Sequence, residues 1–138
     1  MNQRQLQAYK KDSIRSELSV ADPHRVIQML MQGALDRLAL AKGAMERKDL
    51  EVKAATLSRA TTIIQALSSS LNMEIGGELS NNLQALYTYM TDRLADASIN
   101  NDVDAVEEVA KLLAEIKSAW DQIPESAKEE AYSAKAAS

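Results

Sequence analysis

The sequence contains no cysteine and no phenylalanine, and it has few glycines, prolines and aromatic residues. Without cysteine there is no disulfide, no thiolate nucleophile and no cysteine-ligated metal. Only 4 glycines and 2 prolines interrupt a chain rich in alanine, leucine, glutamate, lysine and glutamine, the residues that lose least on entering a helix. With 4 tyrosines and 1 tryptophan as its aromatic residues, the core has to be built from aliphatic and methionine side chains. This composition favours an all-α fold.

Long apolar runs are also missing. Residues 1–7 lack the apolar stretch of a signal peptide, and nothing approaches the roughly 20 apolar residues that cross a membrane. The formal net charge of -4 opposes nucleic-acid binding, because such affinity depends on clustered lysine and arginine. We therefore expect a soluble, cytoplasmic protein whose partners are other proteins, with no nucleic acid and no membrane insertion.

Four amphipathic segments follow one another with recognisable starts and stops. Capping aspartates, paired glycines and prolines predict helices over 23–47, 50–72, 77–99 and 103–123. Their short connections predict an antiparallel four-helix bundle. We expect the bundle to span residues 22–124, after a mobile N-terminal cap segment at 1–21 and before a loose or short-helical C-terminal tail at 125–138.

Each predicted helix carries an apolar stripe at three- and four-residue spacing. The predicted core residues are Ile27, Leu30, Ala34, Leu38, Ala41 and Met45; Leu50, Ala54, Leu57, Thr61, Ile64, Leu67 and Leu71; Leu79, Leu83, Leu86, Met90, Leu94 and Ala97; and Val106, Val109, Leu113, Ile116, Trp120 and Ile123. A second row beside the stripe of the second helix consists of Val52, Ala55, Ala60, Ile63 and Ala66. This row is either a secondary packing face or the floor of a groove for a partner helix.

Two tyrosines in the third predicted helix cannot both belong to the core. Tyr87 and Tyr89 are two residues apart and therefore lie about 160° apart around an ideal helix. Tyr87 is one turn from Leu83 and from Met90, which favours the core for Tyr87. We expect one of the two tyrosines to lie at a surface, in a groove or under the N-terminal segment.

Catalytic machinery is not recognisable. The single histidine, His24, has no glutamate three residues before it, as a bundle metal site requires. It lies in the first turn of a helix and is followed by Arg25-Val26-Ile27, which argues against a phosphoryl-accepting histidine. Gly76-Gly77 lacks the preceding strand and the Gly-Lys-Ser/Thr of a phosphate loop. We expect no enzymatic activity, no cofactor and no metal.

Several segments together resemble a known family. They are Tyr9-Lys10; residues 23–30 with Gly33-Ala34-Leu35; residues 60–67; Leu71-Asn72; Gly76-Gly77-Glu78-Leu79; Asn82-Leu83; residues 86–90; Arg93-Leu94; and Trp120. This order is similar to that of the flagellar secretion chaperone FliS, over about residues 9–123. Met31 and Ser98 depart from the family, which often has an aromatic residue and an asparagine there. The departures leave open whether the partner preference is the usual one.

The resemblance implies a cytoplasmic, non-enzymatic chaperone. Such a protein binds the C-terminal segment of flagellin, prevents its premature polymerisation and assists flagellar type III secretion. Further partners can be the flagellar export apparatus or regulatory proteins. We expect the partner to bind at Tyr9, Ala55, Leu57, Ala60, Ile63 and Ala66 and at whichever of Tyr87 and Tyr89 is exposed. The resemblance also implies that residues 1–20 cover the empty site. The alternative is a non-catalytic helical dimerisation or regulatory module that pairs through the second row.

Overall fold

A computed structural model describes residues 23–71 and 73–123, without the side chains of residues 73–75. All regular structure in these two ranges is helical. The elements are α2 (Pro23–Glu46), α3 (Leu50–Ser69), α4 (Met73–Asn100) and α5 (Val103–Asp121). The predicted all-α class is confirmed. The predicted terminal segments and their boundaries lie outside the described residues.

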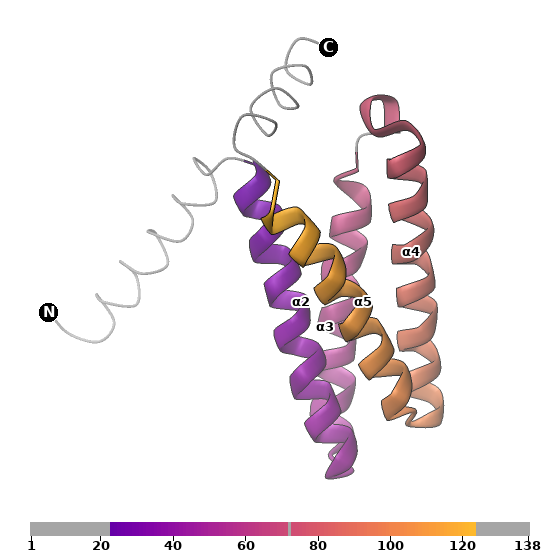
Figure 1. The fold of residues 1–138 in the computed structure, drawn as a ribbon. Coiled ribbons are helices and arrows are strands. Elements are labelled where there is room, and N and C mark those ends of the chain that lie inside the picture. The colour runs from indigo at the N-terminus through magenta and orange to yellow at the C-terminus, as the bar shows by residue number, and fades with distance from the viewer. Residues whose placement is uncertain (1–22, 72, 124–138) are drawn as a thin grey trace, which may run out of the picture.

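The helices alternate in direction and form a four-helix bundle (Figure 1). Each helix packs mainly against two neighbours, since α2 contacts α3 and α5, and α4 contacts α3 and α5. Figure 1 also shows that α5 runs obliquely across the bundle. It begins beside the C-terminal end of α4 and ends beside the N-terminal end of α2, and this oblique path determines which surfaces stay uncovered.

Two aspartates set the starts of α3 and α5, as the sequence predicts. Asp49 accepts a hydrogen bond from the Val52 amide at 3.2 Å, and Asp102 accepts one from the Ala105 amide at 3.2 Å. The backbone amide of Asp49 also donates to the Ala44 carbonyl at 2.8 Å, which closes the end of α2. One residue therefore ends a helix and caps the next, so the connection can be short.

The residue before each of these aspartates has a left-handed backbone. Lys48 has φ 59° and Asn101 has φ 52°. The amide of Lys48 donates to the Met45 carbonyl at 3.2 Å, so the turn after α2 has the hydrogen bonds of a Schellman motif. Asparagine tolerates this conformation better than lysine does, which makes Lys48 the more strained of the two.

The paired glycines bend α4 near its start. Gly77 has φ 51° and ψ -125°, a combination that side chains with a Cβ disfavour strongly. At Gly76, an added Cβ would collide with the side chain of Ser80. We predicted a helix start at residue 77, and the structure instead has a helix from Met73 that is interrupted at Gly77. The glycines therefore form a sharp bend within α4, and they serve as a turn, as expected from the absence of phosphate-loop residues.

The core contains aliphatic and methionine side chains from all four helices. Its most completely buried large members include Met31, Leu38, Met45, Ile64, Leu67, Met90, Leu94, Val106, Val109 and Leu113. The stripe predicted for α5 is confirmed from Val106 to Trp120, with Ile116 and Trp120 packed at its edge, whereas Ile123 lies beyond the end of α5. An added Cβ at Gly33 would lie 3.7 Å from Ile63 Cδ1, which is an ordinary contact, so the packing of α3 on α2 there does not require glycine.

Part of the predicted stripe of α3 is wrong. Leu50 is 70% exposed and Ala54 is also exposed, whereas Lys53 and Thr56 are buried. The Thr56 hydroxyl donates to the Val52 carbonyl at 2.7 Å, so its burial leaves no polar group unpaired. The buried face of α3 is therefore shifted around the helix toward positions 53 and 56. The sequence did not indicate this shift, because the residues at these two positions are polar.

His24 and Trp120 join the start of α2 to the end of α5. Their rings are stacked, with centroids 4.7 Å apart and an angle of 9° between the planes. The Nε2 of His24 lies 2.8 Å from the Trp120 carbonyl oxygen, and Trp120 Nε1 donates to the His24 carbonyl at 3.0 Å. Because a carbonyl oxygen only accepts, His24 Nε2 carries the proton. His24 is 2% exposed, which agrees with the rejection of a phosphoryl-accepting role.

Candidate partner-binding surface

An apolar strip on the N-terminal half of α4 is exposed. The strip consists of Leu79, Leu83 and Leu86, which lie on one face of the helix at four- and three-residue spacing. Leu79 is 65% exposed, Leu86 is 37% exposed and Leu83 is partly buried against the core. We predicted all three as core residues, and for Leu79 and Leu86 the prediction is wrong.

The oblique path of α5 explains this exposure. The hydrogen bonds and ion pairs between α4 and α5 involve Tyr89 and Arg93, which lie C-terminal to the strip. Toward its own C-terminus, α5 instead lies against α2, through His24 and Gln28. Among residues 23–71 and 73–123, no other helix consequently covers the α5-facing side of the N-terminal half of α4. Tyr87 is 3% exposed, so in this part of α4 Tyr87 packs into the core, whereas Leu79 and Leu86 do not.

The facing flank of α5 is also apolar. Leu112 and Ile116 follow Glu108 by one and two helical turns, and Glu108 contacts α4 directly. Both side chains are partly buried at the edge of the core. The strip and this flank therefore belong to the same side of the bundle, where an amphipathic helix could bury its apolar face.

A polar cluster ends this apolar surface at the C-terminal side. Arg93 Nε donates to Glu108 Oε1 at 2.8 Å, and the Tyr89 hydroxyl donates to Glu108 Oε2 at 2.8 Å. These two hydrogen bonds, with that from Arg93 the stronger influence, lower the pKa of Glu108 below its ordinary value. The bond to Glu108 also raises the pKa of Tyr89. Tyr89 is 42% exposed, so its ring remains accessible beside the strip.

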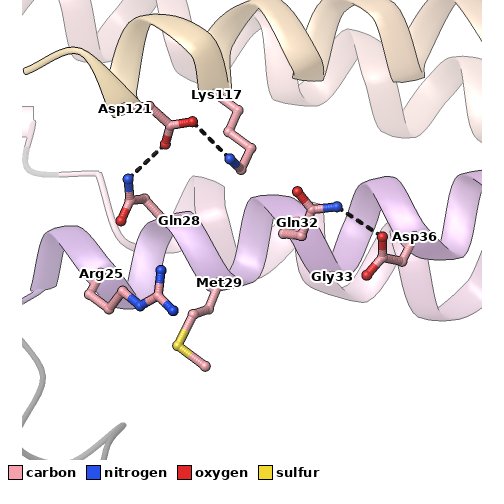
Figure 2. A pocket seen from close by; sticks show the side chains of 8 residues that line it. All are labelled: Arg25, Gln28, Met29, Gln32, Gly33, Asp36, Lys117 and Asp121. Carbon is pink, nitrogen blue, oxygen red and sulfur yellow. Dashed lines mark hydrogen bonds and ion pairs between the residues drawn. The ribbon is translucent and has the colours of Figure 1, made fainter.

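A hollow lies between α2 and α5, apart from the strip, and has a volume of about 440 Å³. Its lining includes Arg25, Gln28, Met29, Gln32, Gly33, Asp36, Lys117 and Asp121. Figure 2 shows Gln28 bound to Asp121 and Lys117 bound to the same carboxylate, at 2.7 and 2.8 Å. These bonds, that from Lys117 first, lower the pKa of Asp121. The lining contains cations and carboxylates in equal number, and the carboxylates already accept hydrogen bonds. It therefore favours neither an anionic nor a cationic ligand.

Metal binding and membrane insertion find no support in the described part of the chain. No group of three or more histidine, cysteine or carboxylate side chains there could hold a metal ion. No helix among the described residues is long and apolar enough to cross a membrane.

The model of the family described as "Flagellar protein FliS" matches residues 5–127. The chain belongs to the FliS family. It is 47% identical over 119 residues to the flagellar secretion chaperone FliS of Vibrio cholerae, covering 86% of this chain and 88% of that protein. It is 48% identical over 118 residues to the flagellar secretion chaperone FliSB of Pseudomonas aeruginosa, covering 86% and 94%. The FliS of Bacillus subtilis is 35% identical over 125 residues, covering 91% and 90%.

The partner-binding residues predicted from the sequence do not form one surface. Leu57 and Ala60 are buried in the core, at 3% and 0% exposure, and Tyr87 is buried as well. The predicted second row of α3 is therefore interrupted at Ala60. Tyr9 lies outside the described residues.

The remaining predicted residues lie on two different sides of the FliS bundle. Ala55 and Ala66 are exposed on α3, and Ile63 is partly buried where α3 meets Gly33 of α2. Tyr89 is exposed on α4, which confirms that one tyrosine is in the core and the other at a surface. The strip residues next to Tyr89 were missed because their spacing also fits a core stripe. The available signal was that Tyr87, one position from Leu86, was itself favoured for the core, so that the apolar face of this helix was too wide for one core.

Proposed function

We propose that this protein is a flagellar export chaperone that binds the C-terminal segment of flagellin in the cytoplasm. It prevents premature polymerisation of that segment, assists type III secretion and catalyses no reaction. Membership of the FliS family supports the chaperone role. The observation that carries the binding site is the exposed apolar strip on α4, with Leu79 65% exposed.

Physical chemistry connects the strip to this role. A flagellin segment that is unfolded and amphipathic before assembly aggregates or polymerises unless its apolar face is covered. A helix laid on the strip would bury that face against Leu79, Leu83 and Leu86, and also against Leu112 and Ile116. The ordering of the segment opposes binding by several kcal/mol, which permits later release.

Binding of purified flagellin C-terminal segment tests this proposal. Sedimentation over a range of concentrations should show a monomeric chaperone that forms a one-to-one complex with the segment. Full-length flagellin should bind, and flagellin without its C-terminal segment should not. A stable dimer that ignores the segment would instead support the dimerisation module.

We also propose that residues 1–20, with Tyr9, cover the empty site as an intramolecular cap. The support is the position of Tyr9 beside Lys10, as in the FliS family. Deletion of residues 1–18 should change the affinity for the flagellin segment and leave the melting temperature nearly unchanged. Unchanged affinity and association rate in the truncated protein would contradict the cap.

A further inference from the structure

The two sides of the bundle differ in charge. Residues 23–69, which form α2, α3 and their turn, contain seven lysines and arginines and four aspartates and glutamates. Residues 76–121, which form most of α4 and α5, contain three basic and nine acidic residues. The first side therefore carries a net charge of about +3 and the second about -6, counted from side chains that are ionised at neutral pH. The acidic side is the one that carries the strip.

Carboxylates lie next to the apolar surface on both helices. Glu78 directly precedes Leu79 and is exposed. On α5, Glu115 directly precedes Ile116, lies two turns after Glu108 and is also exposed. Asp92 is exposed one residue before Arg93, beyond the polar cluster. Lys111 is also exposed, directly before Leu112, so the carboxylates beside these apolar side chains outnumber the exposed lysine.

We propose that the strip selects an amphipathic helix whose apolar side chains are flanked by lysine or arginine. This inference rests on the proposed function and adds the charge of the partner segment to it. The strip spans the eight residues from Leu79 to Leu86, a rise of about 10 Å, so it matches about two turns of the partner helix. Apolar side chains at positions i, i+4 and i+7 or i, i+3 and i+7 of that helix make the contacts. Basic side chains beside them face Glu78 and Glu115.

Charge of this kind acts chiefly on the rate of association. Complementary potentials steer the partner toward the site, whereas exposed charge pairs add little to the lifetime of the complex. Salt weakens the steering, because the Debye length is about 10 Å at 0.1 M ionic strength and shorter above it. Association with the acidic side should therefore be fast at low salt and slow down as salt is added.

Two matched double variants isolate this effect. Glu78→Gln with Glu115→Gln removes two charges beside the strip, one of them in the first turn after Gly77. Glu46→Gln with Glu51→Gln removes two exposed charges on the other side, one of them in the first turn of α3. Both pairs change the net charge equally. The probe is the flagellin C-terminal segment, measured by stopped-flow fluorescence at several salt concentrations.

At low salt we expect the strip pair to lower the association rate constant by about threefold to tenfold, and the control pair by less than about twofold. A flagellin segment whose lysines and arginines are replaced by glutamine should lose this difference. Equal effects of the two pairs, or no effect of either, would overturn the inference while leaving the chaperone proposal intact. Failure of the unmodified protein to bind the segment would overturn both.

Discussion

Two leucines of α4 should respond very differently to truncation. Leu94 is 1% exposed and belongs to the core, whereas Leu79 is 65% exposed on the strip. Leu94→Ala replaces a buried isobutyl group with a methyl group and leaves a cavity, which destabilises a protein by about 2–5 kcal/mol. Leu79→Ala loses only the buried third of a side chain that is worth about 1.5–3 kcal/mol when fully buried, so the loss should stay below about 1 kcal/mol.

The assay is unfolding by urea and by heat, followed by circular dichroism. A loss of about 3 kcal/mol in Leu94→Ala corresponds to a fall in melting temperature of roughly 10–20 °C for a domain of about 100 residues. Leu79→Ala should melt within a few degrees of the unmodified protein. Equal destabilisation by the two substitutions would refute the oblique path of α5, because it would mean that α4 is covered along its whole length.

Other predictions concern the turns and two titrating side chains. Lys48→Gly should stabilise the protein by about 0.5–1 kcal/mol in urea unfolding, because glycine tolerates the φ of 59° there. Gly77→Ala should destabilise it by about 1–2 kcal/mol, and a neutral result would show that the left-handed backbone is not required. Burial raises the pKa of Tyr87 from 10.0 to about 12. Since folding favours the protonated phenol, stability should be complete below pH 10 and fall between 10 and about 12, and Tyr87→Phe should remove that part of the loss. The lowered pKa of Glu108 has the opposite sign, so its contribution is present above the ordinary glutamate pKa and is lost as the pH falls through the lowered value; acid unfolding of Glu108→Gln should lack it.

The sequence allowed the helices and their connections to be predicted because those depend on local chemistry. Asp49 and Asp102 cap helices through contacts three residues away, and such contacts can be inferred from residue type and spacing. The stripe of α5 was also predictable, since it has one dominant apolar face. Gly76 and Gly77 marked a sharp turn for the same local reason.

The candidate site was less predictable because it depends on the angle between two helices. Leu79 and Leu94 occupy similar positions in the helical period, and only the path of α5 separates an exposed strip from a core stripe. Likewise, the stacking of His24 on Trp120 joins residues 96 positions apart, and neither residue alone indicates the other. Ala60 looked like part of a surface row, but its small side chain reflects close packing in the core.

Titration calorimetry of the flagellin C-terminal segment tests the central proposal most directly. Leu79→Ala with Leu86→Ala removes the exposed parts of the strip, and Leu40→Ala is the control, a leucine that is 51% exposed on α2. Burial of those exposed fractions by the segment is worth about 1.5–3 kcal/mol, so the strip variant should bind roughly tenfold to 150-fold more weakly. The control variant should bind as the unmodified protein does. An unchanged dissociation constant for the strip variant, with its melting temperature preserved, would contradict the assignment of this surface to flagellin.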